Sequence, residues 1–156
     1  MEEKTGIFST GNVVFEEARS MIRCDGTSCV VIRGGEIIHT ADGRGVSPLL
    51  MLYNTDKEML RESCVVDRII GKAAAMILVL GGTDAVYGDI MSIAAQTYLS
   101  ARGILFEYGE LVESITDRTG AGLCPIERSV LEIDDPEAGL AAMTNRIAEM
   151  QSAAGV

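Results

Sequence analysis

The stretch that decides the fold reads Ser28-Cys-Val-Val-Ile-Arg33, then Gly34-Gly35, then Glu36-Ile-Ile-His-Thr40. Both arms are rich in β-branched residues, which favour extended strands. The two glycines match the two-residue connection of a tight hairpin, in which both residues need positive φ angles. We therefore predict a β-hairpin here and place the other elements around it.

Helices are predicted on both sides of the hairpin. Asn12 is a suitable N-cap for a first helix, because apolar residues follow it at helical spacing as far as Ile22. After the hairpin, Ser47 followed by Pro48 is typical of an N-cap and a first helical residue. The capping-box pattern Thr55-Asp-Lys-Glu58 predicts another short helix directly afterwards.

The next long segment, Asp67 to Leu80, predicts a helix that ends at Gly81-Gly82. Its last part, Met76-Ile-Leu-Val-Leu80, is also compatible with a strand, because periodicity alone does not separate a buried strand from a buried helix. We favour the helix, because the run is long, rich in alanine and followed by glycines.

Two strands enclose one more helix in the following part of the chain. Ala85-Val-Tyr87 and Ile90-Met91 predict a strand interrupted at Gly88. Ser92 can cap the next helix, and Ile104-Leu-Phe-Glu-Tyr108 predicts another strand.

The last helix follows Asp134-Asp135-Pro136, a strong start signal, whereas Glu110 to Ile133 predicts no regular element. The resulting order is a helix, a hairpin, and then alternating helices and strands. It predicts an α/β fold: a three-layer sandwich whose mixed sheet combines an N-terminal β-hairpin with strands joined by crossover helices.

Length and charge exclude several classes of protein. The chain has 156 residues, which predicts one domain, 1–156, with its core at about 12–150. Its 13 basic residues against 23 acidic residues give a net charge of −10, which argues against nucleic acid and anionic membranes as partners. The four cysteines form no C-x-x-C pair. We expect a reducing, cytoplasmic setting, with Cys24, Cys29 and Cys64 as small buried side chains.

Four strings carry a resemblance to a known family. They are Gly43-Arg-Gly45 with Pro48-Leu-Leu50, Asp67-Arg-Ile-Ile-Gly-Lys-Ala73, Gly120-Ala-Gly-Leu-Cys-Pro-Ile-Glu127 and Ile133-Asp-Asp-Pro-Glu137. With them the chain, from about Val14 to Met150, resembles the domain of unknown function eighteen-ninety-three, a family of small bacterial and archaeal proteins. The resemblance implies a cytidine-deaminase-like fold with no assigned activity.

Comparison with zinc deaminases bears on the chemistry. Those enzymes hold zinc with a His-Ala-Glu that opens one helix and a Pro-Cys-x-x-Cys that opens the next, and the glutamate shuttles protons. The resemblance puts Lys72-Ala-Ala74 at the first place and Met91-Ser-Ile-Ala-Ala95 at the second. A lysine ammonium cannot ligate zinc without losing its proton, and alanine cannot ligate at all. The sole histidine, His39, lies on the hairpin. We therefore expect no zinc, no other cofactor and no zinc-dependent deaminase activity.

Two residues are candidates for chemistry in the former deaminase pocket. Lys72 stands in an apolar stretch, where it is either a base or imine-forming nucleophile with a lowered pKa, or the cation of a structural ion pair. Cys124 lies on a glycine-rich turn, where backbone N–H groups would favour a thiolate, with Arg118 or Arg128 as cationic neighbours. The alternative for Cys124 is a small side chain that fills the turn. We predict that Lys72 and Cys124 lie near one cavity.

Four further residues are candidate ligand-binding residues. Arg44 lies between two glycines before a helix, a pattern that suits an anion. Asp67 and Glu127 are possible carboxylate partners for Lys72, and Ser92 opens the second helix of the pocket.

Two functions from different classes remain open. One is binding of a small ligand, anionic or nucleotide-like, in the former deaminase pocket, with or without chemistry at Cys124 and Lys72. The other is a catalytically inactive deaminase-like module that acts as an interaction or regulatory subunit. In either case the resemblance implies a homo-oligomer, most simply a dimer.

Overall fold

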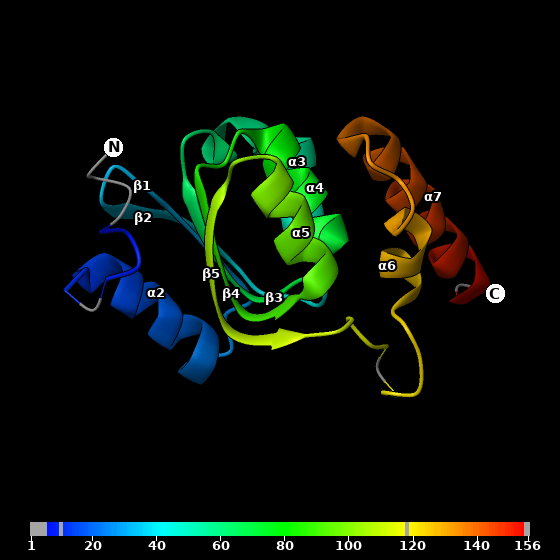
Figure 1. The fold of residues 1–156 in the computed structure, drawn as a ribbon, viewed down its shortest axis with the longest axis horizontal. Coiled ribbons are helices and arrows are strands. Elements are labelled where there is room, and N and C mark those ends of the chain that lie inside the picture. The colour runs from blue at the N-terminus through cyan, green and yellow to red at the C-terminus, as the bar shows by residue number, and fades with distance from the viewer. Residues whose placement is uncertain (1–5, 10, 118, 155–156) are drawn as a thin grey trace.

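The structure is a computed structural model that describes residues 6–9, 11–117 and 119–154. Six helices and a 3-10 helix surround five strands in this described part of the chain (Figure 1). The helices are α2 (Val13–Cys24), α3 (Ser47–Asp56), η1 (Lys57–Leu60), α4 (Lys72–Gly81), α5 (Ile93–Ala101), α6 (Pro125–Val130) and α7 (Pro136–Ala154). The strands are β1 (Cys29–Arg33), β2 (Glu36–Ala41), β3 (Cys64–Ile70), β4 (Ala85–Ser92) and β5 (Leu105–Val112).

The strands form one mixed sheet in the order β2-β1-β3-β4-β5. β1 pairs antiparallel with β2 and with β3, whereas β3, β4 and β5 run parallel. The predicted hairpin is confirmed, and Gly34 and Gly35 adopt φ angles of 63° and 78°. Both angles lie in the left-handed region that the tight turn requires.

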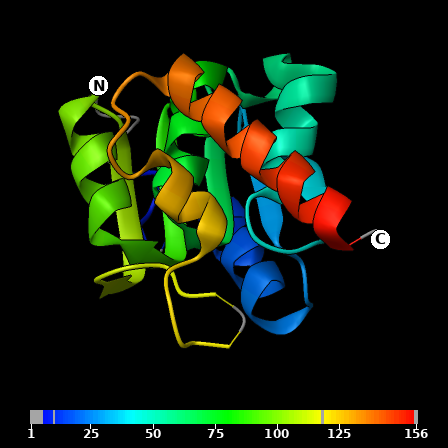
Figure 2. The same ribbon diagram turned by 90° about the vertical axis from the view of Figure 1, so that its right-hand side faces the viewer.

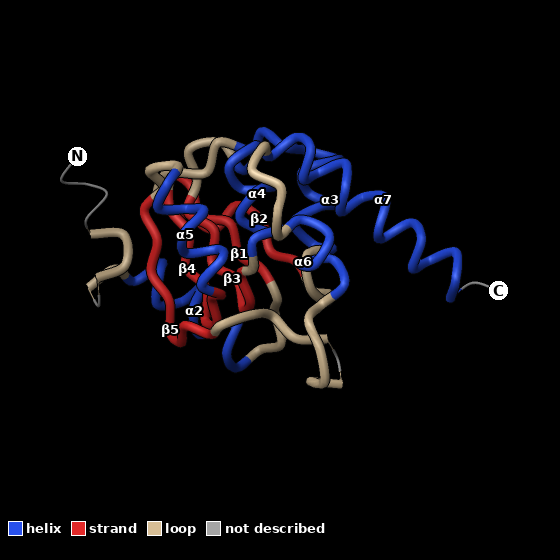
Figure 3. Tube along the Cα trace, turned by 45° about the vertical axis from the view of Figure 1, so that its right-hand side comes forward, coloured by secondary structure: helices blue, strands red, loops and turns tan. Residues whose placement is uncertain are grey.

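Helices cover both faces of the sheet, as the α/β prediction requires (Figures 1 and 2). α2 covers one face, and its Phe15 and Ile22 pack against Val30 and Val66 of the sheet. α3, α4 and α5 cover the other face. α6 and α7 lie outside α4, so that six consecutive residues, Ala73 to Leu78, are buried within it. Figure 3 shows the C-terminal end of α7 projecting beyond this body.

The prediction of a helix from Asp67 onwards is wrong for its first five residues, Asp67 to Gly71. Asp67 to Ile70 continue β3, and α4 begins only at Lys72. β3 is flanked by β1 on one side and β4 on the other, so its backbone groups are satisfied by neighbouring strands that local sequence does not reveal. The helical assignment of Met76–Leu80 is confirmed, and so is its glycine stop, because Gly82 has a φ of 77°. β4 likewise runs through Gly88 without interruption.

Some of the predicted helix starts have the expected N-cap hydrogen bond and others do not. Asn12 accepts a hydrogen bond from the Phe15 N–H, and Ser92 accepts one from the Ala95 N–H, as expected of caps. Ser47, in contrast, is the first residue of α3, and its predecessor Val46 makes no side-chain cap. The predicted capping box at Thr55 is also absent, because the Thr55 hydroxyl donates to the Met51 carbonyl and the residues that follow form a 3-10 helix.

The burial expected of three cysteines is confirmed for two of them. Cys29 and Cys64 are buried, whereas Cys24 is exposed because it is the last residue of α2. No helix in the described residues has the length and apolar character needed to cross a membrane.

Candidate functional site

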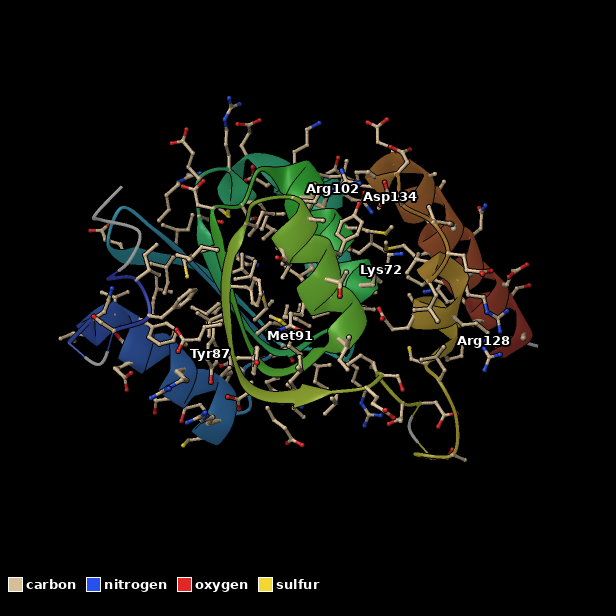
Figure 4. The ribbon with its side chains drawn as sticks, in the orientation of Figure 1. Lys72, Tyr87, Met91, Arg102, Arg128 and Asp134 are labelled. Carbon is tan, nitrogen blue, oxygen red and sulfur yellow. The ribbon has the colours of Figure 1, made fainter. Side chains whose placement is uncertain are left out.

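The carboxyl ends of the parallel strands β3 and β4 lead directly into the starts of α4 and α5. Such edges are where α/β sheets commonly bind ligands, because helix N-termini and strand ends meet there. The sequence candidates Lys72 and Ser92 both lie at these helix starts. Figure 4 shows Lys72 on the side of α4 that faces α6.

Glu127 of α6 occupies the N-terminus of α4. Its two carboxylate oxygens accept hydrogen bonds from the backbone N–H groups of Lys72, at 2.9 Å, and Ala73, at 2.8 Å. Residue 71 has to be glycine for this contact, because a Cβ there would come within 2.5 Å of the Glu127 carboxylate. A carboxylate in α6 is therefore the N-cap of a helix that begins 55 residues earlier.

Burial raises the pKa of Glu127, although the bonds from the Ala73 and Lys72 N–H groups and the nearby Lys72 ammonium oppose the rise. The carboxylate is only 5% exposed. A negative charge at this place also interacts favourably with the positive end of the α4 dipole.

The ammonium of Lys72 points to the connection between α6 and α7. It donates to the Leu131 carbonyl at 2.7 Å and lies 5.7 Å from the centre of the Tyr98 ring. The Arg102 guanidinium lies over the same ring at 4.7 Å. It donates to the Asp134 carbonyl at 2.7 Å, and so does the Tyr98 hydroxyl, also at 2.7 Å.

These contacts make one cluster, which we call the α6–α7 clamp: Lys72, Tyr98 and Arg102 hold the chain at Leu131 and Asp134. Figure 4 shows Lys72, Arg102 and Asp134 along the gap between α5 and the segment leading to α7. Sequence reasoning missed Tyr98, Arg102 and Asp134 as partners of this site. Only Lys72 gave a signal, as a cation in an apolar stretch.

Cys124 lies at the opposite end of α6 from the clamp. It directly precedes the helix, is half-buried, and its N–H donates to the Ile115 carbonyl at 2.9 Å. α6 has six residues, about 9 Å at the usual helical rise, so the Lys72 ammonium at Leu131 is directed away from Cys124. Arg128 is exposed, and Arg118 lies outside the described residues. The structure thus brings Lys72 together with Glu127 and separates its ammonium from Cys124.

Asp67 is a buried carboxyl in the centre of the sheet. It lies between Cys29 of β1 and Gly88 of β4 and is 4% exposed. It accepts a hydrogen bond from the Ile69 N–H at 3.2 Å. Burial raises the pKa of Asp67 to about 7, against the opposing effect of bonds from the Ile69 and Arg68 N–H groups and the Cys29 thiol. Burial, together with the Asp67 charge, also raises the pKa of the Cys29 thiol.

The remaining candidates have other partners. The buried Ser92 hydroxyl accepts the Ala95 N–H at 3.1 Å and so is engaged as the cap of α5. Arg44 is exposed on the loop before α3, between Gly43 and Gly45, which have φ angles of 138° and 57°. Within the described residues, no group of three or more His, Cys, Asp and Glu side chains is arranged to hold a metal ion.

Of the comparisons with known proteins, the family model and one solved structure give the same family. A family model described as "Domain of unknown function (DUF1893)" matches residues 17–147. No curated protein matches the chain. Among solved structures, a DUF1893 family protein (TM1506) from Thermotoga maritima is 26% identical, with a TM-score of 0.78 over 85% of this chain and 89% of that chain. A mutant of a protein named NE0047, in complex with 8-azaguanine, is 14% identical, with a TM-score of 0.40 over 86% of this chain and 82% of that one.

Proposed function

This chain belongs to the DUF1893 family, and we propose that it is a deaminase-like module without zinc that acts by binding a protein partner, in the first place a second copy of itself. The element order, a helix and a hairpin followed by alternating helices and strands, is the one that the deaminase resemblance implies. Zinc deaminases carry their metal ligands at two helix starts. This chain has Lys72 and Ser92 there, and the Ser92 hydroxyl already caps α5.

The observation that carries the proposal is the Glu127 carboxylate on the start of α4. Two backbone N–H groups that would otherwise face an anion are bonded to it at 2.9 and 2.8 Å. An anionic ligand would have to break both bonds and leave a buried carboxylate beside its own negative charge. In the proposed module, the chain itself occupies the place where a deaminase would bind its ligand.

The α6–α7 clamp supports the same conclusion. Lys72 and Arg102 each donate to a main-chain carbonyl of the connection at 2.7 Å, which fixes the end of α6 that follows Glu127. Hydrogen bonds from charged donors are stronger than neutral ones. α6 is therefore held through Glu127 and at its C-terminal end, which favours a permanent closure over a mobile lid.

Exposed apolar side chains are consistent with the proposal of a protein partner. Contiguous apolar patches are commonly found at interaction surfaces, so the proposed partner is expected to cover a group of exposed apolar residues. The large exposed apolar residues of the described chain lie on four helices, two strands and the α6–α7 connection: Val13, Met51, Ile69, Ile93, Tyr108, Leu131 and Met150. We expect a dimer at micromolar concentration, and light scattering tests this directly, since a strictly monomeric mass contradicts self-association.

A ligand screen tests the closed pocket. We expect no rise in melting temperature of the wild-type protein with cytidine, adenosine, guanosine or their monophosphates, and no release of ammonia from any of them. Elemental analysis is expected to find no stoichiometric zinc. About one zinc per chain, or a clear stabilisation by one of these compounds, would contradict the proposal.

One observation favours a second candidate, a small-ligand site with acid–base chemistry. Asp67, with a pKa of about 7, is poised to exchange a proton near neutral pH and lies beside the Cys29 thiol. In this alternative Cys124 serves as a nucleophilic thiolate, and the Lys72 ammonium leaves the Leu131 carbonyl to stabilise that thiolate.

Thiol labelling distinguishes the two candidates. The exposed Cys24 is first changed to serine, because Cys29 and Cys64 are buried and Cys124 then becomes the most accessible thiol. Iodoacetamide labelling against pH gives the pKa of Cys124, which the second candidate requires to be well below the ordinary value and to rise in Lys72→Met. An ordinary value that Lys72→Met leaves unchanged favours the closed module.

A further inference from the structure

The opposite edge of the sheet, where β3 and β4 begin, contains an open cavity. It lies between η1 and the C-terminal end of α4 and has a volume of about 380 Å³. This is within the range of small-molecule sites. Its lining is charged at one end and glycine-rich at the other: Lys57, Glu58, Arg61, Glu62, Leu80, Gly81 and Gly82.

A smaller, more apolar cavity shares one lining residue, Glu62, with the first. It has a volume of about 150 Å³ and lies between the hairpin turn and the start of α2. Its apolar lining comes from Ile7, Val14, Phe15, Ile32 and Cys64. Glu62 lines both cavities, so a ligand that extends from one into the other passes this side chain.

The backbone of Glu62 is in an unusual conformation. Among the described residues it is the only one other than glycine with a positive φ, 55°. This conformation costs energy for a side chain with a Cβ, and such residues are concentrated at ligand clamps and other functional sites. The N–H of Glu62 donates to the Gly82 carbonyl at 2.9 Å, which fixes the residue against the end of α4.

The charges around the larger cavity are of both signs. Lys57 and Arg61 are cationic, and Glu58 lies 4.0 Å from Arg61, a weak and exposed pair. In the described part of the chain no hydrogen bond or ion pair engages the Glu62 carboxylate. The cavity thus offers two cations to an anion and a free carboxylate to a cation.

We propose that this edge binds a small zwitterion with an apolar side chain, that is, an apolar α-amino acid. Its carboxylate interacts with Lys57 and Arg61, its ammonium with Glu62, and its side chain enters the cavity lined by Phe15 and Ile32. This site is separate from the carboxyl edge, and its binding does not depend on the closure by Glu127.

The first experiment compares ligands. Leucine and phenylalanine, each at about 10 mM, are expected to raise the melting temperature of the wild-type protein by about 2–4 °C. 4-Methylpentanoate, which is leucine without the ammonium, and isopentylamine, which is leucine without the carboxylate, are expected to raise it less. The proposal fails when neither amino acid has an effect, or when one of the truncated ligands matches leucine.

The second experiment uses a matched pair of variants at Glu62. Aspartate and asparagine both tolerate a positive φ better than glutamate, so Glu62→Asp and Glu62→Asn relieve the backbone equally and differ in charge. Calorimetric titration with leucine should give near wild-type affinity for Glu62→Asp and about threefold weaker binding for Glu62→Asn. Equal affinities in the two variants would show that the carboxylate is not used and would overturn the proposal.

Discussion

The β3–α4 and β4–α5 junctions lie side by side at one edge of the sheet but are completed in different ways. At the β4–α5 junction, Ser92 caps its own helix three residues on. At the β3–α4 junction, Gly71 has no side chain and the cap comes from Glu127, with buried Asp67 four residues before the junction. One junction is therefore a local structure, whereas the other depends on the C-terminal part of the chain. The function that we propose depends on this second arrangement. Glu127 occupies the start of α4, where a ligand would otherwise bind.

The largest expected difference between the junctions is in the pH dependence of the free energy of unfolding. It arises from Asp67, near the β3–α4 junction. The pKa of Asp67 is raised from 3.8 to about 7 in the folded protein, so the folded state holds a proton that the unfolded state has released. Stability from this group is fully present below its ordinary pKa and is lost as pH rises towards about 7. We expect the free energy of unfolding to fall by about 4 kcal/mol between about pH 4 and pH 8.

Urea unfolding at several pH values measures this decrease, and Asp67→Asn is the matched variant. Because asparagine does not titrate, most of the decrease should be absent in that variant. Burial raises the pKa of Glu127 as well, so a smaller decrease of the same sign should remain. Equal pH dependence in both proteins would mean that Asp67 is not the group responsible.

The second prediction concerns the two caps directly. Glu127→Ala leaves the N–H groups of Lys72 and Ala73 without their partner inside the protein, so we expect a loss of about 3 kcal/mol. Ser92→Ala removes one neutral bond and should cost about 1 kcal/mol.

The exposed Glu132, five residues after Glu127, is the control. Its replacement by alanine should change stability by less than about 0.5 kcal/mol. If Ser92→Ala costs as much as Glu127→Ala in urea unfolding, the contrast between a local and a long-range cap is wrong.

The same contrast explains how much could be predicted from the sequence. The hairpin, the Asn12 and Ser92 caps and the glycine stop of α4 depend on residues within a few positions of one another, and all were predicted correctly. Asp67 to Ile70 were assigned to a helix because their strand partners are distant in sequence.

The site follows the same rule. Glu127 was considered as a carboxylate partner for Lys72, but its bonds to the α4 backbone require knowing that α6 packs on α4. Likewise, no local pattern connects Lys72 with Leu131 or Tyr98, since these contacts join helices far apart in the chain. The residue types indicated which side chains belong to the site, but the sequence did not show which residues they contact.

The smallest predicted effect concerns the clamp and uses two lysines in similar surroundings. The ammonium groups of Lys72 and Lys57 lie 5.7 and 5.9 Å from the ring centres of Tyr98 and Tyr53, but of the two only Lys72 also has a described hydrogen bond, to the Leu131 carbonyl. Methionine keeps most of the apolar stem of lysine and removes the charge. We expect Lys72→Met to cost about 1 kcal/mol in urea unfolding and Lys57→Met less than about 0.5 kcal/mol. Because the cation–π geometry is nearly the same at both places, the difference isolates the bond that fastens the α6–α7 connection. Equal losses would mean that this bond contributes nothing, and the closure of the β3–α4 junction would then rest on Glu127 with Tyr98 and Arg102.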